Sequence, residues 1–344
     1  MVTLIGMGSG KWEALSAQAQ QAVRSAGLVF GAKRLLAGLP PECTARQFAL
    51  YQPADILETL AQNSGQDAAV LYSGDTGFYS GASGLLTPLR ALGIPARVYP
   101  GVSSIQLLSA ALGRPWQDWK LVSAHGCACD PVAECMMNRS VFFLTGGTET
   151  PASLCQKLTD AGMGEAHGVV GENLGTEAEA IRYGSAAELA GQSFAPLSVL
   201  LVENFDLPQL RAPGFPDESF IRSEVPMTKQ EVRAAALAKL AVMPTDTLWD
   251  VGAGTGSVSV ELALAAPKGR VYAVECEPDA CELIRKNRAK FHACNLILIE
   301  GRAPDVLADL PAPDAVFIGG TKGGMETVLD EVLGKNPNAR ICIS

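Results

Sequence analysis

The sequence predicts an α/β protein made of two successive units, each with strands and helices in alternation. In residues 1–205, short apolar runs that end in glycine alternate with Ala- and Leu-rich stretches of helical character. Four prolines then fall within residues 206–226 among scattered charges, and the alternation starts again at residue 227. Such alternation is typical of mainly parallel sheets covered by helices, and clustered prolines are typical of linkers. We therefore expect one unit over 1–205, a linker over 206–226 and a second unit over 227–344.

The first unit contains six segments with the apolar character of buried strands. They are residues 2–8, 68–74, 96–101, 140–147, 167–175 and 196–204. Helical segments are expected over 12–26 and 103–112, the latter with Ser103 as N-cap, and Pro151 begins another helix.

The second unit repeats the pattern with five strand segments and intervening helices. The strands are expected over 247–254, 270–276, 295–301, 314–320 and 339–344. A helix over 228–242 precedes them, and Thr228 with Glu231 has the spacing of a capping box at its start. Five strands in this rhythm indicate a doubly wound sheet.

Composition excludes several classes of protein. Hydrophobic residues make up 48% and charged residues 18%, which argues against disorder. No apolar run is long enough for a transmembrane helix, and the N-terminus lacks the basic start of a signal peptide. The nine cysteines include no CxxC pair, which favours a reduced, cytoplasmic protein. The net charge of −9 argues against a nucleic-acid partner, and the basic run over 285–290 is expected to be a solvated helix face.

One cysteine-containing segment has an alternative interpretation as a metal site. His125, Cys127, Cys129 and Cys135 are soft metal ligands that lie close together in sequence. They lack the paired spacing of known zinc modules, so we expect thiols in or beside a loop and no bound metal.

A glycine turn follows the first strand of the second unit. Its residues are Asp250, Gly252, Ala253, Gly254, Thr255 and Gly256. Glycine in such a turn lets the backbone approach a ligand closely before the next helix begins. The dinucleotide-binding pattern GxGxxG would need glycine at Ser257, so the turn is instead GxGxG. That variant suits a ligand without a pyrophosphate.

Two further features follow at the ends of the next two strands. Glu275 would accept hydrogen bonds from both hydroxyls of a ribose, and Gly301 with Ala303 would lie at an adenine edge. In this order the three features resemble class I S-adenosylmethionine (SAM)-dependent methyltransferases. The resemblance implies SAM as cofactor and a Rossmann-like fold. It also implies two strands beyond the fifth, so we expect this unit to be incomplete at its C-terminus.

The first unit carries a different set of motifs. Its turn at 6–10 also fails the dinucleotide pattern, because the third position is Lys11. The ordered segments 73–81, 99–113, 116–126 and 170–181 resemble the two-lobed tetrapyrrole methylase family. The resemblance implies a second SAM between the lobes, contacted by Gly8, Ser9, Gly74, Asp75, Phe78, Ser103, Ser104, Leu144 and Leu197. Two positions depart from the family: Thr76 stands where proline is common, and Cys127 where arginine is common.

Taken together, the two units resemble a fused family of cobalamin synthesis that methylates C5 and C15 and decarboxylates. Segments 226–234, 250–261 and 316–324 resemble its C15-methylating part, in which Thr228 would lie over SAM. The resemblance implies precorrin-6B as the tetrapyrrole substrate, loss of CO2 from the ring C acetate, and S-adenosyl-L-homocysteine as product. It also implies C5 methylation by the first unit, one SAM per unit, and a homo-oligomer (dimer or tetramer).

Transfer of a methyl group to an electron-rich carbon requires alignment more than a strong base. No nucleophile–base arrangement is evident in the sequence. Candidates for binding substrate carboxylates or moving a proton are His125, Lys229, Arg233, Arg302 and Lys322, each with the alternative of an ordinary structural or solvated role. Three other functions stay open: the same reactions on cobalt-containing intermediates, a non-catalytic SAM-binding protein, and an RNA methyltransferase.

Overall fold

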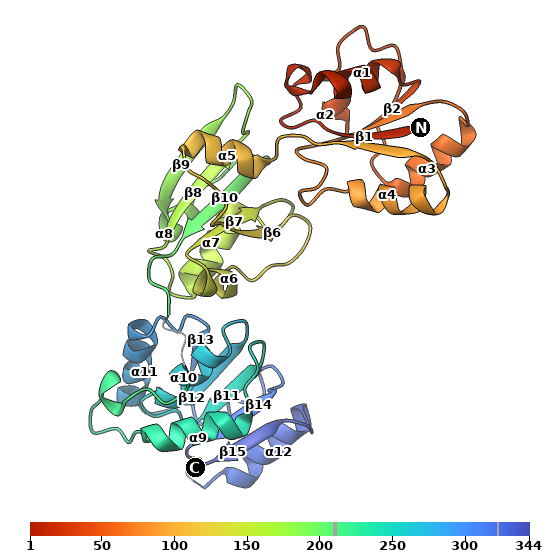
Figure 1. The fold of residues 1–344 in the computed structure, drawn as a ribbon. Coiled ribbons are helices and arrows are strands. Elements are labelled where there is room, and N and C mark those ends of the chain that lie inside the picture. The colour runs from red at the N-terminus through yellow and green to blue at the C-terminus, as the bar shows by residue number, and fades with distance from the viewer. Residues whose placement is uncertain (209–211, 322) are drawn as a thin grey trace.

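The computed structural model describes residues 1–208, 212–321 and 323–344. It contains three five-stranded sheets arranged in succession along the chain (Figure 1). Two of them lie in the first predicted unit and the third in the second. Among the described residues, no helix has the length and apolar character needed to cross a bilayer.

The first sheet is entirely parallel, with strand order β3-β2-β4-β1-β5. Its strands are β1 (Val2–Gly6), β2 (Leu28–Phe30), β3 (Arg46–Phe48), β4 (Ala68–Tyr72) and β5 (Ala96–Tyr99). The helices around it are α1 (Ala17–Ser25), α2 (Lys33–Leu36), α3 (Pro53–Gln62) and α4 (Ala82–Ala91). Alternate residues of β1 belong to two different hydrophobic clusters, so helices bury both faces of the sheet.

The second sheet has the order β6-β7-β10-β8-β9. Its strands are β6 (Lys120–Ser123), β7 (Ser140–Leu144), β8 (His167–Glu172), β9 (Ala180–Ser185) and β10 (Ser198–Glu203), with helices α5 (Ser104–Leu112), α6 (Pro131–Met137), α7 (Pro151–Asp160) and α8 (Ala186–Ala190). Only β6 and β7 pair in parallel, and the other three pairings are antiparallel. The expectation of a mainly parallel sheet therefore holds for the first sheet and not for this one.

The third sheet is parallel, with the doubly wound order β13-β12-β11-β14-β15. Its strands are β11 (Thr247–Val251), β12 (Arg270–Glu275), β13 (Leu296–Glu300), β14 (Ala315–Ile318) and β15 (Arg340–Ile343). Helices α9 (Gln230–Leu240), α10 (Ser257–Ala265), α11 (Pro278–Lys290) and α12 (Met325–Lys335) surround it. All five expected strands are present, and the order reverses direction between β11 and β14, where such folds bind ligands.

The predicted capping box at Thr228 is wrong. Helix α9 begins at Gln230 with Lys229 as N-cap, and the Lys229 side chain makes no capping hydrogen bond. The carbonyl oxygen of Thr228 instead accepts a hydrogen bond from the Arg233 guanidinium, so Thr228 lies before the helix. Because the helix starts after Lys229, Glu231 is its second residue and not its third, so the spacing of Thr228 and Glu231 does not form a capping box.

Part of the segment expected as a linker is packed into the second unit. Phe215 and Phe220 are buried in the cluster formed by α9, α10 and the sheet. The two rings pack against each other and against Phe291 at the end of α11. Aromatic residues spaced among prolines thus fasten this segment instead of leaving it free.

Candidate functional sites

A cavity of about 310 Å³ lies between the first and second sheets. The loops after β1 and β4 line one side, and the ends of β7, β8 and β10 line the other. All nine residues predicted to contact SAM in this unit line it, together with the candidate His125: Gly8, Ser9, Gly74, Asp75, Phe78, Ser103, Ser104, Leu144 and Leu197. Residues spread over about 190 positions of the sequence, from Gly8 to Leu197, therefore line one cavity.

Close backbone approach explains the glycines on the first side of this cavity. Gly8 and Gly74 exchange two backbone hydrogen bonds, of 3.1 and 2.9 Å. Behind them, a Cβ on Gly101 would lie 2.3 Å from the carbonyl oxygen of Gly74 and 2.6 Å from that of Gly6. Three strand ends thus touch through their backbones, and no larger residue fits at their contact.

Two polar residues of the first cavity have defined partners. The Asp75 carboxylate accepts backbone hydrogen bonds from Gly77 at 2.8 Å and from Gly101 at 3.1 Å, which holds its loop against β5. The Nδ1 atom of His125 lies 3.2 Å from the carbonyl oxygen of Thr145. His125 is exposed, so the alternative of a buried structural histidine does not apply.

Sequence reasoning missed several residues of this cavity. Arg34, Ser73, Tyr79, Asn173 and Thr176 also line it. Arg34 lies in α2, and its guanidinium donates to the Ser73 hydroxyl at 2.6 Å without an ion pair to any other described residue. No local pattern marks Arg34, because only the packing of α2 beside β4 brings it to the cavity.

A second cavity, of about 490 Å³, lies at the carboxyl ends of the strands in the third sheet. Seven of the predicted cofactor-binding residues line it: Thr228, Gly252, Ala253, Gly254, Glu275, Gly301 and Ala303. Arg302 also lines it, is exposed, and forms no ion pair with the described residues. The segment 225–228 forms a further wall, supplied by the chain before α9.

Gly252 lies where the glycine turn passes close to the backbone of Gly320, which follows β14. Its φ angle is +74°, and a Cβ there would lie 2.3 Å from the carbonyl oxygen of Gly320. The N–H groups of Gly252 and Ala253 both donate to the carbonyl oxygen of Val274, at 3.0 and 3.1 Å. The glycine turn is thereby fixed to β12 and β14 with its next residues facing the cavity.

Glu275 is buried and already carries three backbone hydrogen bonds. Its Oε2 accepts from Gly254 at 2.8 Å, and its Oε1 accepts from Cys276 and Glu277 at 2.7 and 2.9 Å. A carboxylate has about four lone-pair sites, so about one remains, on Oε2. This differs from the expected pair of hydrogen bonds to a ribose, because the carboxylate also holds the glycine turn.

The remaining predicted residues lie away from the cavity surface. Asp250, Thr255 and Gly256 are buried beneath the turn, and Lys229 is exposed beside Asp217. Arg233 is completely buried with carboxylate and carbonyl partners, so its proposed role as a cation for substrate carboxylates is wrong. Lys322 lies outside the described residues.

The buried carboxyl group of Asp250 predicts a pH-dependent stability. Burial, with a smaller contribution from the charge of Glu275, raises its pKa to about 7 against the hydrogen bond from Ser259. Between about pH 4 and 7 the unfolded state loses this proton and the folded state keeps it, so stability falls as pH rises. We expect Asp250→Asn to remove up to about 4 kcal/mol of this fall, measured by urea unfolding from pH 4.5 to 8. Identical pH slopes for the two proteins would contradict it.

The alternative metal cluster is not brought together. Cys135 is buried in the core of the second sheet, and Cys127 is exposed and hydrogen-bonded to the carbonyl oxygen of Ser123. Among the described residues, no three His, Cys, Asp or Glu side chains are grouped so that they could hold a metal ion.

Comparisons with known proteins agree with the two units. The family model of tetrapyrrole (corrin/porphyrin) methylases matches residues 1–190, and that of the precorrin methyltransferase domain matches residues 219–344. The chain is 32% identical over 331 residues to the precorrin-6Y C(5,15)-methyltransferase [decarboxylating] of Sinorhizobium sp, covering 94% of this chain and 79% of that protein. It is 53% identical over 116 residues to the probable cobalt-precorrin-6B C(15)-methyltransferase (decarboxylating) of Sulfolobus acidocaldarius, covering 33% of this chain and 60% of that protein.

Among solved structures, the methyltransferase CobJ is similar in fold, with a TM-score of 0.50, 19% identity, and coverage of 60% of this chain and 94% of that chain. Fold and sites thus define a methyltransferase that combines a tetrapyrrole methylase unit with a class I methyltransferase unit. The chain belongs to the family of precorrin-6Y C(5,15)-methyltransferases (decarboxylating).

Proposed function

We propose that this chain methylates precorrin-6B at C5 and C15 and removes CO2 from the ring C acetate, giving precorrin-8 in cobalamin synthesis. One observation carries this proposal: two unlike cavities, each built on glycine backbone at strand ends, occur in one chain. The cavity between the first two sheets would serve C5. The cavity in the second unit would serve C15 and the decarboxylation. No disulfide joins cysteines among the described residues, which fits a reducing compartment such as the cytoplasm.

Each cavity has features that suit one SAM, with S-adenosyl-L-homocysteine as product. Volumes of about 310 and 490 Å³ lie within the usual range for small-molecule sites. In the second cavity the glycine turn presents backbone, because a Cβ on Gly252 or Gly254 would meet the backbone of Gly320 or Pro226. Oε2 of Glu275 has a free acceptor site for a ribose hydroxyl. When bound, SAM supplies an electrophilic methyl group.

The protein's own part is to align the reacting carbon and to exclude water. The backbone pair of Gly8 with Gly74 and the turn at 252–254 would fix the donor, without a catalytic base at the attacked carbon. Arg34 at the first cavity and Arg302 at the second are exposed cations positioned for substrate carboxylates. Arg34 would supply the cation that Cys127 does not provide. His125, through its second ring nitrogen, would bind a carboxylate or donate a proton.

Mass spectrometry of the products tests the proposal. The complete protein is incubated with labelled SAM and either precorrin-6B or its cobalt complex. We expect two methyl gains and the loss of one CO2 with one of these substrates, and the preferred substrate decides between the metal-free and cobalt routes. SAM binding without any methyl transfer would instead indicate a non-catalytic protein.

Changing Glu275 is expected to separate the two reactions. Glu275→Gln removes the negative charge that holds the turn and faces the ribose, and a hydrogen bond to a charged group contributes about 1.5–3 kcal/mol. We expect kcat/KM for C15 methylation to fall about 10- to 100-fold while C5 methylation is unchanged. Glu282→Gln, at an exposed position on α11, is the matched control and should affect neither reaction. Equal losses of both methylations would contradict the assignment of the second cavity.

A further inference from the structure

The segment over residues 214–228, here called the strap, leads from the first unit into α9 and ends at the second cavity. Its last residues, 225–228, line that cavity. A Cβ on Gly254 would lie 3.1 Å from the carbonyl oxygen of Pro226, so the strap and the glycine turn are in direct contact across the cavity wall. The shape of this wall therefore depends on what holds the strap.

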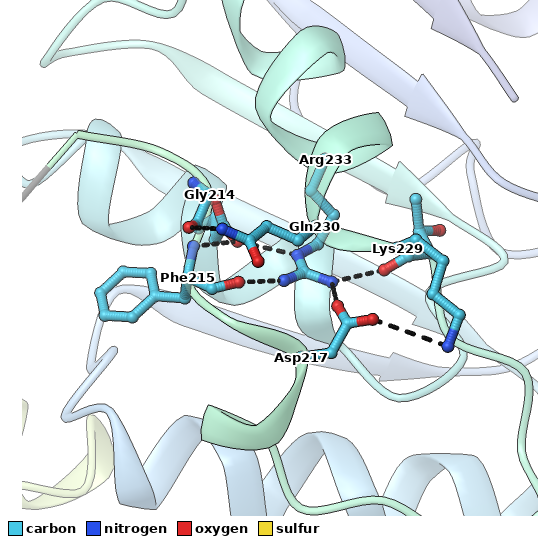
Figure 2. A network of polar contacts seen from close by, with 8 residues as sticks. Gly214, Phe215, Asp217, Lys229, Gln230 and Arg233 are labelled. Atoms are coloured by element: carbon cyan, nitrogen blue, oxygen red, sulfur yellow. Dashed lines mark hydrogen bonds and ion pairs between the residues drawn. The ribbon is translucent and has the colours of Figure 1, made fainter.

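The first anchor of the strap is Arg233, shown with its partners in Figure 2. Its guanidinium donates to the Asp217 carboxylate at 2.8 Å and to the backbone carbonyl oxygens of Phe215 and Thr228. It also donates through Nε to Glu261 on α10 at 2.8 Å, and it lies over the Phe220 ring. One buried side chain thus binds three separated points of the strap.

Glu261 extends the same network from the other side. Its Oε2 accepts from the N–H of Gly214 at 2.6 Å, and its Oε1 accepts from the N–H of Phe215 at 3.2 Å. Glu261 lies in α10, the helix that begins directly after the glycine turn. The start of the strap is therefore attached to the helix that positions the turn.

Asn287 on α11 is the second anchor and connects the strap to the turn itself. Its Oδ1 accepts from the N–H of Ile221 at 2.7 Å, and its Nδ2 donates to the carbonyl oxygens of Ile221 at 3.0 Å and Thr255 at 2.9 Å. Asn287 is completely buried, so these bonds are shielded from water. The middle of the strap and the glycine turn share one side chain as their common support.

We propose that Arg233 and Asn287 are positioning residues of the C15 methyl-transfer site, which hold the strap against the glycine turn so that residues 225–228 form a wall of the SAM pocket. This rests on the function proposed above. Neither residue lines the cavity, so both act through the strap and the turn. Weakening either anchor should lower the affinity for SAM at this site and leave the first site unchanged.

The test compares variants at three positions of the complete protein. Asp217→Ala removes one partner of Arg233 from a position whose side chain is still 17% exposed, and Asn287→Ala removes the second anchor. The matched control is Asp246→Ala, which removes a carboxylate paired with Arg340 at the opposite end of the same sheet. We expect KM for SAM in C15 methylation to rise about tenfold in the first two proteins and less than twofold in the control. KM for SAM in C5 methylation serves as the internal reference and should not change.

Asp217→Asn keeps a hydrogen-bond acceptor for Arg233 and should recover most of the affinity for SAM. A purely charge-based effect would not be recovered by this variant.

Hydrogen exchange of the unmutated protein gives a second measurement that needs no variant. SAM should slow amide exchange in both 214–228 and 252–256. Protection of 252–256 without protection of the strap, or unchanged KM values in folded variants, would overturn the role of the strap alone. Protection of neither segment would overturn the second SAM site as well.

Discussion

Replacing Gly252 by alanine should abolish C15 methylation and decarboxylation while C5 methylation continues. The new Cβ would lie 2.3 Å from the carbonyl oxygen of Gly320, and the φ angle of +74° disfavours any side chain. The left-handed backbone conformation costs about 1–2 kcal/mol, and relief of the overlap must move the turn. A displacement near 1 Å reduces catalysis about 100-fold, so we expect at least that loss in kcat/KM for C15 methylation.

The control for this variant is Gly334→Ala in α12. No atom lies within 4 Å of a Cβ at that position, and alanine favours the helix, so activity and stability should be kept or slightly improved. Both proteins are assayed for the two methylations and for thermal unfolding. C15 methylation at more than about a tenth of the normal rate in Gly252→Ala would show that the turn does not position the donor.

Replacing Gly101 by alanine should have the complementary effect on the first unit. The Cβ would meet the backbones of Gly74 and Gly6 at 2.3 and 2.6 Å, where the ends of β1, β4 and β5 touch. Because backbone atoms surround it, no side-chain rotation relieves the overlap, and the loop that carries Asp75 must shift. We expect kcat/KM for C5 methylation to fall about 100-fold or more, with C15 methylation retained.

Gly84→Ala in α4 is the matched change in the same unit. Its Cβ would be 3.6 Å from Pro53, an ordinary contact, so C5 methylation should be unaffected. Product masses separate the two methylations in a single assay. Loss of C15 methylation together with C5 methylation in Gly101→Ala would mean that the two units do not act independently.

Much of the fold could be predicted because the relevant signals are local. Apolar runs that end in glycine located β1, β4, β11 and β14, since a buried parallel strand must be apolar along its length. The strands β2 and β3 were not predicted because each has only three residues. The edge strands β6 and β9 were not predicted because their residues are mostly not buried and give no continuous apolar run. The antiparallel pairing of β10 with both of its neighbours also has no local signature.

The site residues also divide into those with a local sequence signal and those without one. Gly252, Gly254 and Glu275 could be predicted because a turn after a strand and an acid at the next strand end have a fixed spacing. Arg34 and Asn287 could not, since their neighbours are about 40 and 66 positions away. Arg233 was predicted to lie near the site, but with the wrong role. It was expected to be a free cation, and its burial against Glu261 makes it a structural support.

The sequence by itself determined the two α/β units, the glycine turns and the absence of a dinucleotide pattern, because these depend on residue type and short spacing. Only the tertiary structure decided which side chains share a cavity and which are sealed beneath it. It also decided that the proline-containing segment is a strap and not simply a linker. The physical reason is that burial and hydrogen bonding depend on neighbours distant in sequence, such as Glu261 for Gly214, and such contacts exist only once the chain has folded.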